Sequence, residues 1–345
     1  MRKIDESKPV LVTGGTGYVA SWIIKTLLDK GMHVHTTVRD PSNSKKVEHL
    51  TSMTNASAGS MKLFQADLLD SGSFDQAMRD CELVIHTASP FFVTNIKNPE
   101  EELIRPAREG TRNVLESANR NSTVKRVVLT SSAAAIYGDN ADIALTQTGI
   151  FTEKDWNVTS SPEHQPYHYS KTIAEKEAWA IAKAQDHWDL VVINPGWILG
   201  PSLSKRKDSM SISLMIQLGN GTHKMGVPEL WYGIADVRDA AMAHVKAGFI
   251  PEASGRHIIV SQETTILDLA NLLRKHFGDH YPFPRRQVPK FLFWLIAPIH
   301  GLTRKYVIKN TGIQIKFDNS WSKKDLGMSY IPVSYTHLTL PTKRI

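Results

Sequence analysis

A tyrosine and a lysine stand four residues apart in the segment YHYSK, as Tyr167 and Lys171, within a stretch whose composition predicts a helix. Residues at this spacing share one helix face, so the phenol and the amine can reach each other. A free phenol has a pKa of about 10, and a neighbouring ammonium is expected to lower it. The tyrosine could then give a proton to a carbonyl oxygen that Ser132 holds by a hydrogen bond. The alternative is an ordinary helix on which the spacing arose by chance.

The elements that must position this pair begin near the N-terminus, where PVLVTGGTGYVASWIIKTLLDKG predicts a strand, a glycine turn and an amphipathic helix. Side chains in the turn would keep the backbone amides away from a pyrophosphate, which in such a unit rests on the helix N-terminus. A second strand, HVHTTV, follows after about 20 residues, as a dinucleotide-binding unit requires. The residues expected around the pyrophosphate are Gly14, Thr16, Gly17, Tyr18 and Val19, with Ala20 as the third small residue of the pattern.

The end of that second strand indicates which dinucleotide is bound. An arginine there suits the 2′-phosphate of NADP(H), whereas NAD(H) needs an acidic residue for its ribose 2′-hydroxyl. The chain has Arg39, whose guanidinium could fork onto the phosphate, and Lys46, whose ammonium could add a point charge. NADP(H) is therefore the favoured cofactor. In the alternative, both cations belong to an ordinary surface and Asp40 binds the ribose of NAD(H).

Strands and helices continue to alternate as far as about residue 200, which predicts an α/β fold with a doubly wound (Rossmann) parallel sheet. Ligands of such sheets bind at the carboxyl ends of the strands. Several residues that directly follow predicted strands are therefore expected at the site. We assign Asp67 and Leu68 to the adenine edge, Thr87, Ala88 and Ser89 to the cofactor backbone, Ser132 to the reacting centre, and Pro195 and Gly196 to the nicotinamide.

The length of 345 residues predicts one large domain that carries a smaller lobe. We expect residues 1–200 to form the NADP-binding core with the catalytic residues, and residues 201–332 to form mainly a C-terminal substrate-binding lobe with elements that return to the core. Residues 333–345, VSYTHLTLPTKRI, resemble the translated end of a sequencing adapter and are set aside as an artefact. The candidate pocket walls of the lobe are Met210, Met215, Met225, Trp231 and residues 291–294.

Composition argues against several other classes of protein. The formal net charge is +7, with two of the basic residues in the last segment, and the excess is scattered. Such a surface suits anionic small molecules rather than nucleic acid. The single cysteine, Cys81, can form neither an intrachain disulfide nor a metal or redox pair, and the chain opens without a secretory signal, so we expect a cytoplasmic protein.

One apolar run, residues 291–297 in KFLFWLIAPIHGL, bears on membrane contact. It is shorter than the about 20 apolar residues of a membrane span, and Pro298 interrupts it. We expect a buried or pocket-lining helix there, in preference to a segment that lies at a membrane interface.

The chain resembles an extended short-chain dehydrogenase/reductase, and within that superfamily the group of dihydroflavonol reductase, cinnamoyl-CoA reductase and microbial aldehyde and ketone reductases. The segments VTGGTGYVASWIIKTLL, TVRDPSNSKKVEHL, ADLLDSGSFDQAM, LTSSAAAIYG, YHYSK and NPGWILGPSL carry the resemblance. It implies Ser132, Tyr167 and Lys171 as catalytic residues and Arg39 with Lys46 as ligands of the 2′-phosphate. The implied activity is NADPH-dependent reduction of an aldehyde or ketone to an alcohol.

Three departures from related patterns limit what the resemblance implies. Ala133 stands where sugar-nucleotide epimerases have a hydroxyl residue, so the serine assignment follows the reductases. Tyr137 falls close to the position of a substrate-reading asparagine in plant flavonoid reductases, and the extended signature of cinnamoyl-CoA reductases is missing. Neither plant substrate is therefore implied, and a small hydrophobic carbonyl compound is the expected substrate.

Other readings of the sequence remain open. A nucleotide-sugar epimerase or dehydratase would keep its cofactor bound and use it twice. A 3β-hydroxysteroid dehydrogenase-like enzyme would differ in direction and substrate, and a non-catalytic NADP-sensing protein would use only the scaffold. We expect a monomer or a homodimer, with no nucleic-acid or membrane partner.

Overall fold

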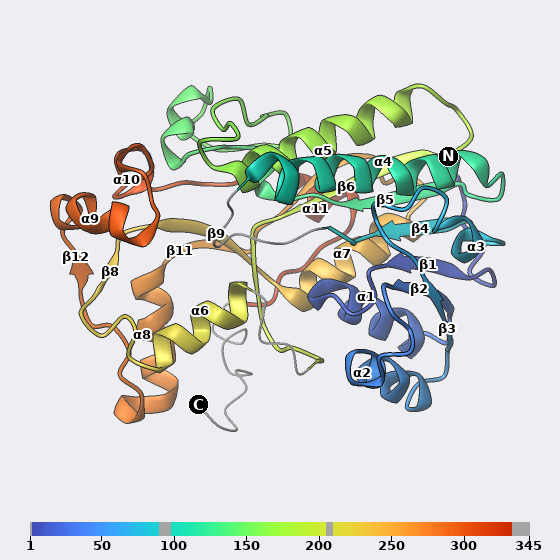
Figure 1. Ribbon diagram of the computed structural model, residues 1–345, viewed down its shortest axis with the longest axis horizontal. Coiled ribbons are helices and arrows are strands. Elements are labelled where there is room, and N and C mark those ends of the chain that lie inside the picture. The colour runs from blue at the N-terminus through green and yellow to red at the C-terminus, as the bar shows by residue number, and fades with distance from the viewer. Residues whose placement is uncertain (1, 90–97, 205–209, 333–345) are drawn as a thin grey trace.

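A seven-stranded parallel sheet forms the centre of the molecule in the computed structural model, which describes residues 2–89, 98–204 and 210–332 (Figure 1). The strand order is β10-β6-β5-β4-β1-β2-β3, and each strand pairs in parallel with its neighbours. This confirms the doubly wound α/β fold. The strands are β1 (Val10–Thr13), β2 (His33–Val38), β3 (Ser60–Gln65), β4 (Leu83–His86), β5 (Arg126–Thr130), β6 (Asp189–Pro195) and β10 (Gly255–Ile259).

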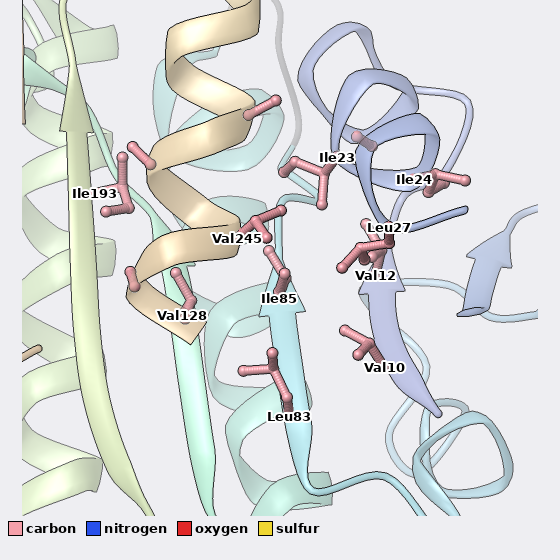
Figure 2. Close-up of a cluster of buried hydrophobic side chains, with 14 of the residues drawn as sticks. Val10, Val12, Ile23, Ile24, Leu27, Leu83, Ile85, Val128, Ile193 and Val245 are labelled. Carbon is pink, nitrogen blue, oxygen red and sulfur yellow. The ribbon is translucent and has the colours of Figure 1, made fainter. Parts of the chain in front are cut away.

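Helices cover both faces of this sheet, because consecutive residues of a strand point to opposite sides. Val10 and Val12 of β1 pack into one apolar layer with α1 (Tyr18–Asp29) and α7 (Val237–Phe249), which Figure 2 shows around Ile23 and Val245. Leu11, between the two valines, packs into the other layer with α4 (Arg105–Arg120) and α5 (Pro166–Lys183). The two layers hold β1 and the turn that follows it in a fixed position.

The strand order reverses beside β1. The chain runs from β1 outward through β2 to β3 and then returns to β4 on the other side of β1. The loops after β1 and β4 therefore part in opposite directions and leave a crevice at the carboxyl ends of the strands, the usual ligand position in this architecture. Thr13 and His86, the last residues of the two strands, stand opposite each other in the register.

The remaining elements complete the core and build a smaller lobe, at the left of Figure 1. A three-stranded sheet of β7, β9 and β11 and a two-stranded sheet of β8 and β12 form its framework. The strands are β7 (Trp197–Leu199), β8 (Val227–Pro228), β9 (Trp231–Asp236), β11 (Gln262–Thr265) and β12 (Gln287–Val288). The other helices are α2 (Ser44–Asn55), α3 (Asp75–Met78), α6 (Met210–Gly219), α8 (Ile266–Phe277), α9 (Lys290–Ile296), α10 (Arg304–Asn310) and α11 (Ser320–Asp325), and the short helical turns are η1 (Glu100–Ile104), η2 (Ala133–Ala135), η3 (Asn140–Leu145), η4 (Gly278–His280) and η5 (Ala297–His300).

Two helices begin in ways that apolar periodicity does not show. Helix α4 is preceded by a single π-helical turn, Glu100–Ile104. Helix α7 starts at Val237, because the carboxylate of Asp236 caps its first turn while the preceding residues belong to strand β9.

The apolar run 291–297 forms the expected helix, but the expectation that it is buried or lines the pocket is wrong for most of its side chains. Phe293 and Ala297 are buried, whereas Phe291, Leu292, Leu295 and Ile296 are exposed. No helix in the described part of the chain is long and apolar enough to cross a membrane. The segment set aside as an artefact, residues 333–345, lies outside the described residues, as does the side chain of Met210.

Candidate functional site

A cavity of about 400 Å³ opens at the crevice beside β1, between the carboxyl ends of the core strands and the lobe. The residues that line it come from the start of α1, the loops after β4 and β5, the first turns of α5, the segment after β6, and α6 and β9 of the lobe. Among the residues expected at the site, the cavity wall includes Gly17, Tyr18, Val19, Thr87, Ser89, Ser132, Tyr167, Lys171, Pro195 and Gly196.

The remaining expected residues do not line this cavity. Gly14 and Ala88 lie against each other, because a Cβ atom added to Gly14 would stand 3.0 Å from the Cα of Ala88. Arg39 follows β2, and Lys46 lies in the first turn of α2. Asp67 and Leu68 come two and three residues after the end of β3. Thr16 stands within the turn between β1 and α1.

The glycine turn suits a pyrophosphate. Gly14 has a φ of +70°, and a Cβ atom on Gly17 would stand 3.0 Å from the carbonyl oxygen of Gly14. Helix α1 begins directly afterwards without a side-chain cap and without an acidic residue in its first turn. The backbone amides at its N-terminus therefore have no side-chain acceptor from a cap, and the first residues of the helix line the cavity. Such a helix start favours a bound anion. A third close approach was not found from the sequence: a Cβ atom on Gly15 would meet the hydroxyl of Thr36 at 2.3 Å.

The residues at the end of β2 also suit an NADP-type ligand better than an NAD-type ligand. Arg39 and Lys46 are both exposed. The carboxylate of Asp40 accepts hydrogen bonds from the hydroxyl and the backbone amide of Ser42, at 2.6 and 3.0 Å, and these bonds lower its pKa. These bonds engage Oδ1 of Asp40 and hold the carboxylate in its own turn.

The start of α5 places Tyr167 in the cavity. Gln165, immediately before the helix, has a left-handed φ of 59°, and Pro166 occupies the first turn, where a missing N–H costs nothing. The side-chain amide of Gln165 donates to the carbonyl of Gly138 at 3.1 Å. His164 lies 2.7 Å from the carboxylate of Asp139, which ties the segment before the helix to the loop after β5.

Ser132, Tyr167 and Lys171 converge as the sequence predicts. Ser132 hydrogen-bonds the Tyr167 hydroxyl, and its own oxygen accepts the amide of Ala134 at 3.1 Å. The ammonium of Lys171 lies 5.8 Å from the centroid of the Tyr167 ring and donates to the hydroxyl of Ser89 at 2.9 Å. A phenol, a hydroxyl and an amine thus meet in one wall of the cavity.

The prediction that Lys171 lowers the pKa of Tyr167 is wrong in this structure. Burial raises the pKa of Tyr167 to about 12, against the lowering effect of its hydrogen bond with Ser132. Burial also lowers the pKa of Lys171 to about 8. The reason is geometric: the ammonium bonds Ser89 rather than the phenol, and both groups are removed from water, which disfavours each charged form.

A buried carboxylate behind the three residues was missed by sequence reasoning. Glu175 accepts hydrogen bonds from the Ser131 hydroxyl at 2.5 Å, the Asn194 amide at 2.8 Å and the Arg256 guanidinium at 2.6 Å. Asn194 also donates to the backbone carbonyl of Ser132 at 3.2 Å. Glu175 stands four residues after Lys171 on the same helix face, and an acidic residue at that spacing was the available signal.

The substrate side of the cavity is mostly aromatic and aliphatic. His168 lies edge-on to both Tyr137 and Tyr167, and burial lowers the pKa of its imidazole to about 4. Tyr137 stacks on Phe151, with ring centroids 4.9 Å apart. The lobe contributes Trp197, Ile198, Ser202, Ser204, Ser211, Ile212, Tyr232 and Gly233.

None of the described candidate pocket walls lines this cavity. Met215 is buried in the core of the lobe, and Met225 is exposed. Trp231 packs in the cluster of Ile136 and Tyr137 without lining the cavity itself, and residues 291–294 belong to α9. Apolar composition alone could not separate a pocket wall from the lobe's own core or from its surface.

Known proteins resemble the chain over most of its length. A model of the "NAD dependent epimerase/dehydratase family" matches residues 10–260. Cinnamoyl-CoA reductase CAD2 of Medicago truncatula is 38% identical over 285 residues, which cover 81% of this chain and 82% of the relative. Dihydroflavonol 4-reductase of Gerbera hybrida is 33% identical over 316 residues, which cover 91% and 83%.

A solved structure extends the similarity to the whole fold. The yeast methylglyoxal/isovaleraldehyde reductase Gre2, complexed with NADPH, has a TM-score of 0.77 and 27% sequence identity, and the match covers 96% of both chains. These matches confirm the resemblance drawn from the motifs. The chain belongs to the NAD-dependent epimerase/dehydratase family, within its group of reductases related to cinnamoyl-CoA reductase and dihydroflavonol reductase.

Proposed function

We propose that this protein reduces aldehydes or ketones to alcohols with NADPH. The observation that carries the proposal is the meeting of Ser132, Tyr167 and Lys171 in one cavity wall, opposite the uncapped N-terminus of α1. The first three suit proton transfer to an oxygen atom, and the helix start suits a pyrophosphate. The group of reductases to which the chain belongs supports the same activity.

The cofactor assignment follows from the glycine turn and the residues after β2. Gly14, Gly17 and the first amides of α1 would hold the pyrophosphate, and Arg39 with Lys46 would hold the 2′-phosphate. The similar Gre2 structure is complexed with NADPH, which supports this choice over NADH. When bound, NADPH supplies the hydride that reduces the carbonyl carbon.

The protein's own residues would handle the oxygen of the substrate. Because its pKa is raised to about 12, Tyr167 stays protonated at neutral pH and can donate its proton to the oxygen as negative charge develops there. Ser132 donates its single O–H to the phenol oxygen in this structure, and it would turn that O–H to the substrate oxygen when a substrate binds. Below about pH 8 the Lys171 side chain carries a positive charge, 5.8 Å from the centre of the Tyr167 ring.

The cavity favours a small hydrophobic carbonyl compound. Its aromatic wall, formed by Tyr137, Trp197 and Tyr232, offers much apolar surface and few charged groups. The similar Gre2 enzyme is named for methylglyoxal and isovaleraldehyde, two small carbonyl compounds. A single buried cysteine suits action in the reducing cytoplasm.

The test is oxidation of NADPH with a panel of aldehydes, α-keto esters and aryl ketones. The Tyr167→Phe variant should lose about 100-fold or more in kcat, because general acid catalysis contributes at least that much. It should still bind NADPH, seen as a change in nicotinamide fluorescence. Tyr169→Phe, two residues along the same helix and outside the cavity wall, serves as the matched control and should keep its rate.

Three results would count against the proposal. Equal rates in the wild type and Tyr167→Phe would remove the proposed proton donor. A purified protein that retains its cofactor and does not oxidise added NADPH would assign the site to an epimerase or dehydratase. Faster turnover with NADH than with NADPH would overturn the roles of Arg39 and Lys46.

A further inference from the structure

Exposed apolar side chains gather at the end of the lobe that lies farthest from α2 in Figure 1. Phe291 is 65% exposed and Ile299 is 82% exposed. Soluble proteins rarely gather large apolar side chains in this way without a partner. We call this area the α9–α10 surface, and its apolar members are Phe291, Leu292, Leu295, Ile296, Ile299 and Ile308.

The two helices keep these side chains outside because their inner faces are already filled. Phe293, Ala297 and Val307 form a small buried cluster between α9 and α10. The ammonium of Lys290 ties the start of α9 to the end of α10, through the backbone carbonyls of Ile308 at 3.2 Å and Thr311 at 2.9 Å. The exposed positions 291, 295 and 299 follow the spacing of one helix face. The packing between α9 and α10 therefore fixes these apolar side chains on the outside of the lobe.

The charges around this surface are all of one sign along the sequence. Residues 285–310 contain six lysines and arginines and no aspartate or glutamate. Lys305 and Lys309 are exposed on α10, and Arg286 is exposed just before β12. Two carboxylates from other segments lie nearby: Asp279 pairs with Arg285 at 2.6 Å, and Glu229 lies beside Gly312, just after α10. An apolar face bordered by lysine and arginine is typical of helices that lie in a membrane interface.

A second copy of the chain fits this surface poorly. A two-fold contact places the same patch on both sides, so the cations around it would face their own copies. The six apolar side chains also carry no hydrogen-bonding group, whereas protein interfaces of standard size make about ten direct hydrogen bonds. Acyl chains need no such bonds, and anionic headgroups attract each nearby lysine or arginine by about 1 kcal/mol.

We propose that the α9–α10 surface binds reversibly to anionic membranes, with Phe291 and Ile299 inserted at the acyl boundary and Lys305 and Lys309 on the headgroups. The contact is peripheral, because the segment is too short to span a bilayer. It departs from the sequence-based expectation that the protein has no membrane partner.

The test is flotation of the full chain with vesicles of phosphatidylcholine, with and without phosphatidylserine as the anionic lipid. The wild type should float with the anionic vesicles, and less in high salt, since screening weakens the headgroup attraction. Phe291→Ser with Ile299→Ser should weaken vesicle binding by about 100-fold or more. Lys305→Glu with Lys309→Glu should weaken it by about 25-fold or more, at roughly fivefold per charge.

The matched control is Leu69→Ser with Trp321→Ser, which removes two exposed apolar side chains, one after β3 and one on α11, away from α9 and α10. This variant should bind vesicles like the wild type, and thermal melting shows that each variant is folded. Absence of wild-type binding to anionic vesicles, or an equal loss in the control variant, overturns the proposal. So does a concentration-dependent dimer that Phe291→Ser with Ile299→Ser abolishes, because it would assign the surface to a second copy.

Discussion

Lys171 shows how one buried residue can set the pH dependence of the site. The residue is 8% exposed, and its ammonium bonds only the neutral hydroxyl of Ser89 among the described side chains. Burial disfavours the charged form, so the proton leaves at about pH 8 instead of at the higher pH of an exposed lysine. Tyr167 keeps its own proton far above that pH. In the pH range of most assays, Lys171 is therefore the group of the pair that titrates.

A pH profile of kcat/KM for NADPH tests this assignment, because that ratio reports groups of the cofactor-free enzyme. The ammonium is present below pH 8 and is lost as the pH rises, so the ratio should be level near neutrality. Above about pH 8 it should fall, approaching tenfold per pH unit. Lys171→Arg keeps a positive charge throughout this range and should show no such fall, even if it is slower. A wild-type profile that stays level to pH 10 would contradict the role of the lysine.

At the scale of elements, Glu175 joins three strands and a helix behind Ser132, Tyr167 and Lys171. It is fully buried on α5 and bonds residues at the ends of β5 and β6 and the guanidinium of Arg256 on β10. Arg256 is itself stacked on the ring of Trp156, 4.0 Å from its centroid. The helix that carries Tyr167 and Lys171 is thereby fixed to the strand end that carries Ser132.

Removing this one charge should be costly. Glu175→Gln leaves the buried guanidinium of Arg256 without its counter-charge, and breaking a buried pair typically costs about 3 to 5 kcal/mol. We expect the free energy of unfolding in urea to fall by about 3 kcal/mol. The double variant Glu175→Leu with Arg256→Met removes both charges and should recover part of the loss. A change below about 0.5 kcal/mol in Glu175→Gln would show that the pair does not hold these elements together.

The elements themselves could be predicted where the signal is local. The strand, glycine turn and helix over residues 10–29 follow from apolar periodicity and small residues, and the Tyr167 and Lys171 spacing follows from helix geometry. The partners of Glu175 could not be predicted, because Arg256 comes 81 residues later and joins the network only when β10 pairs with β6. The lining of the cavity by Trp197 and Tyr232 likewise depends on how the lobe folds back.

The direction in which the pKa of Tyr167 shifts could not be predicted from the sequence either. Spacing shows that an amine can reach a phenol, but it does not show that Ser89 receives the ammonium or that both groups are buried. The same limit applies to the run 291–297. Its composition indicates an apolar helix, whereas its exposure depends on which residues fill the space between α9 and α10.

At the scale of the whole molecule, the segment that ends the described chain closes the fold. Leu326 and Met328 belong to the apolar layer formed by α1, α7 and the main sheet. The carboxylate of Asp325 lies 2.6 Å from His257 on β10, and the backbone amide of Ile331 donates to Asp239 on α7. Residues 320–332 therefore pack against the core domain, although they follow the lobe in the sequence.

A substitution before residue 332 should therefore destabilise the protein, whereas removal of the residues after it should not. Leu326→Ala opens a cavity at a fully buried site and should lower the free energy of unfolding by about 3 kcal/mol. Leu145→Ala, at an exposed position, is the matched control and should change the free energy of unfolding by less than about 0.5 kcal/mol.

Deletion of residues 333–345, which the sequence predicts to be adapter-derived, should leave both urea unfolding and NADPH oxidation unchanged. A deletion that destabilises the protein as much as Leu326→Ala would show that the last segment belongs to the fold, and the adapter hypothesis would then be wrong.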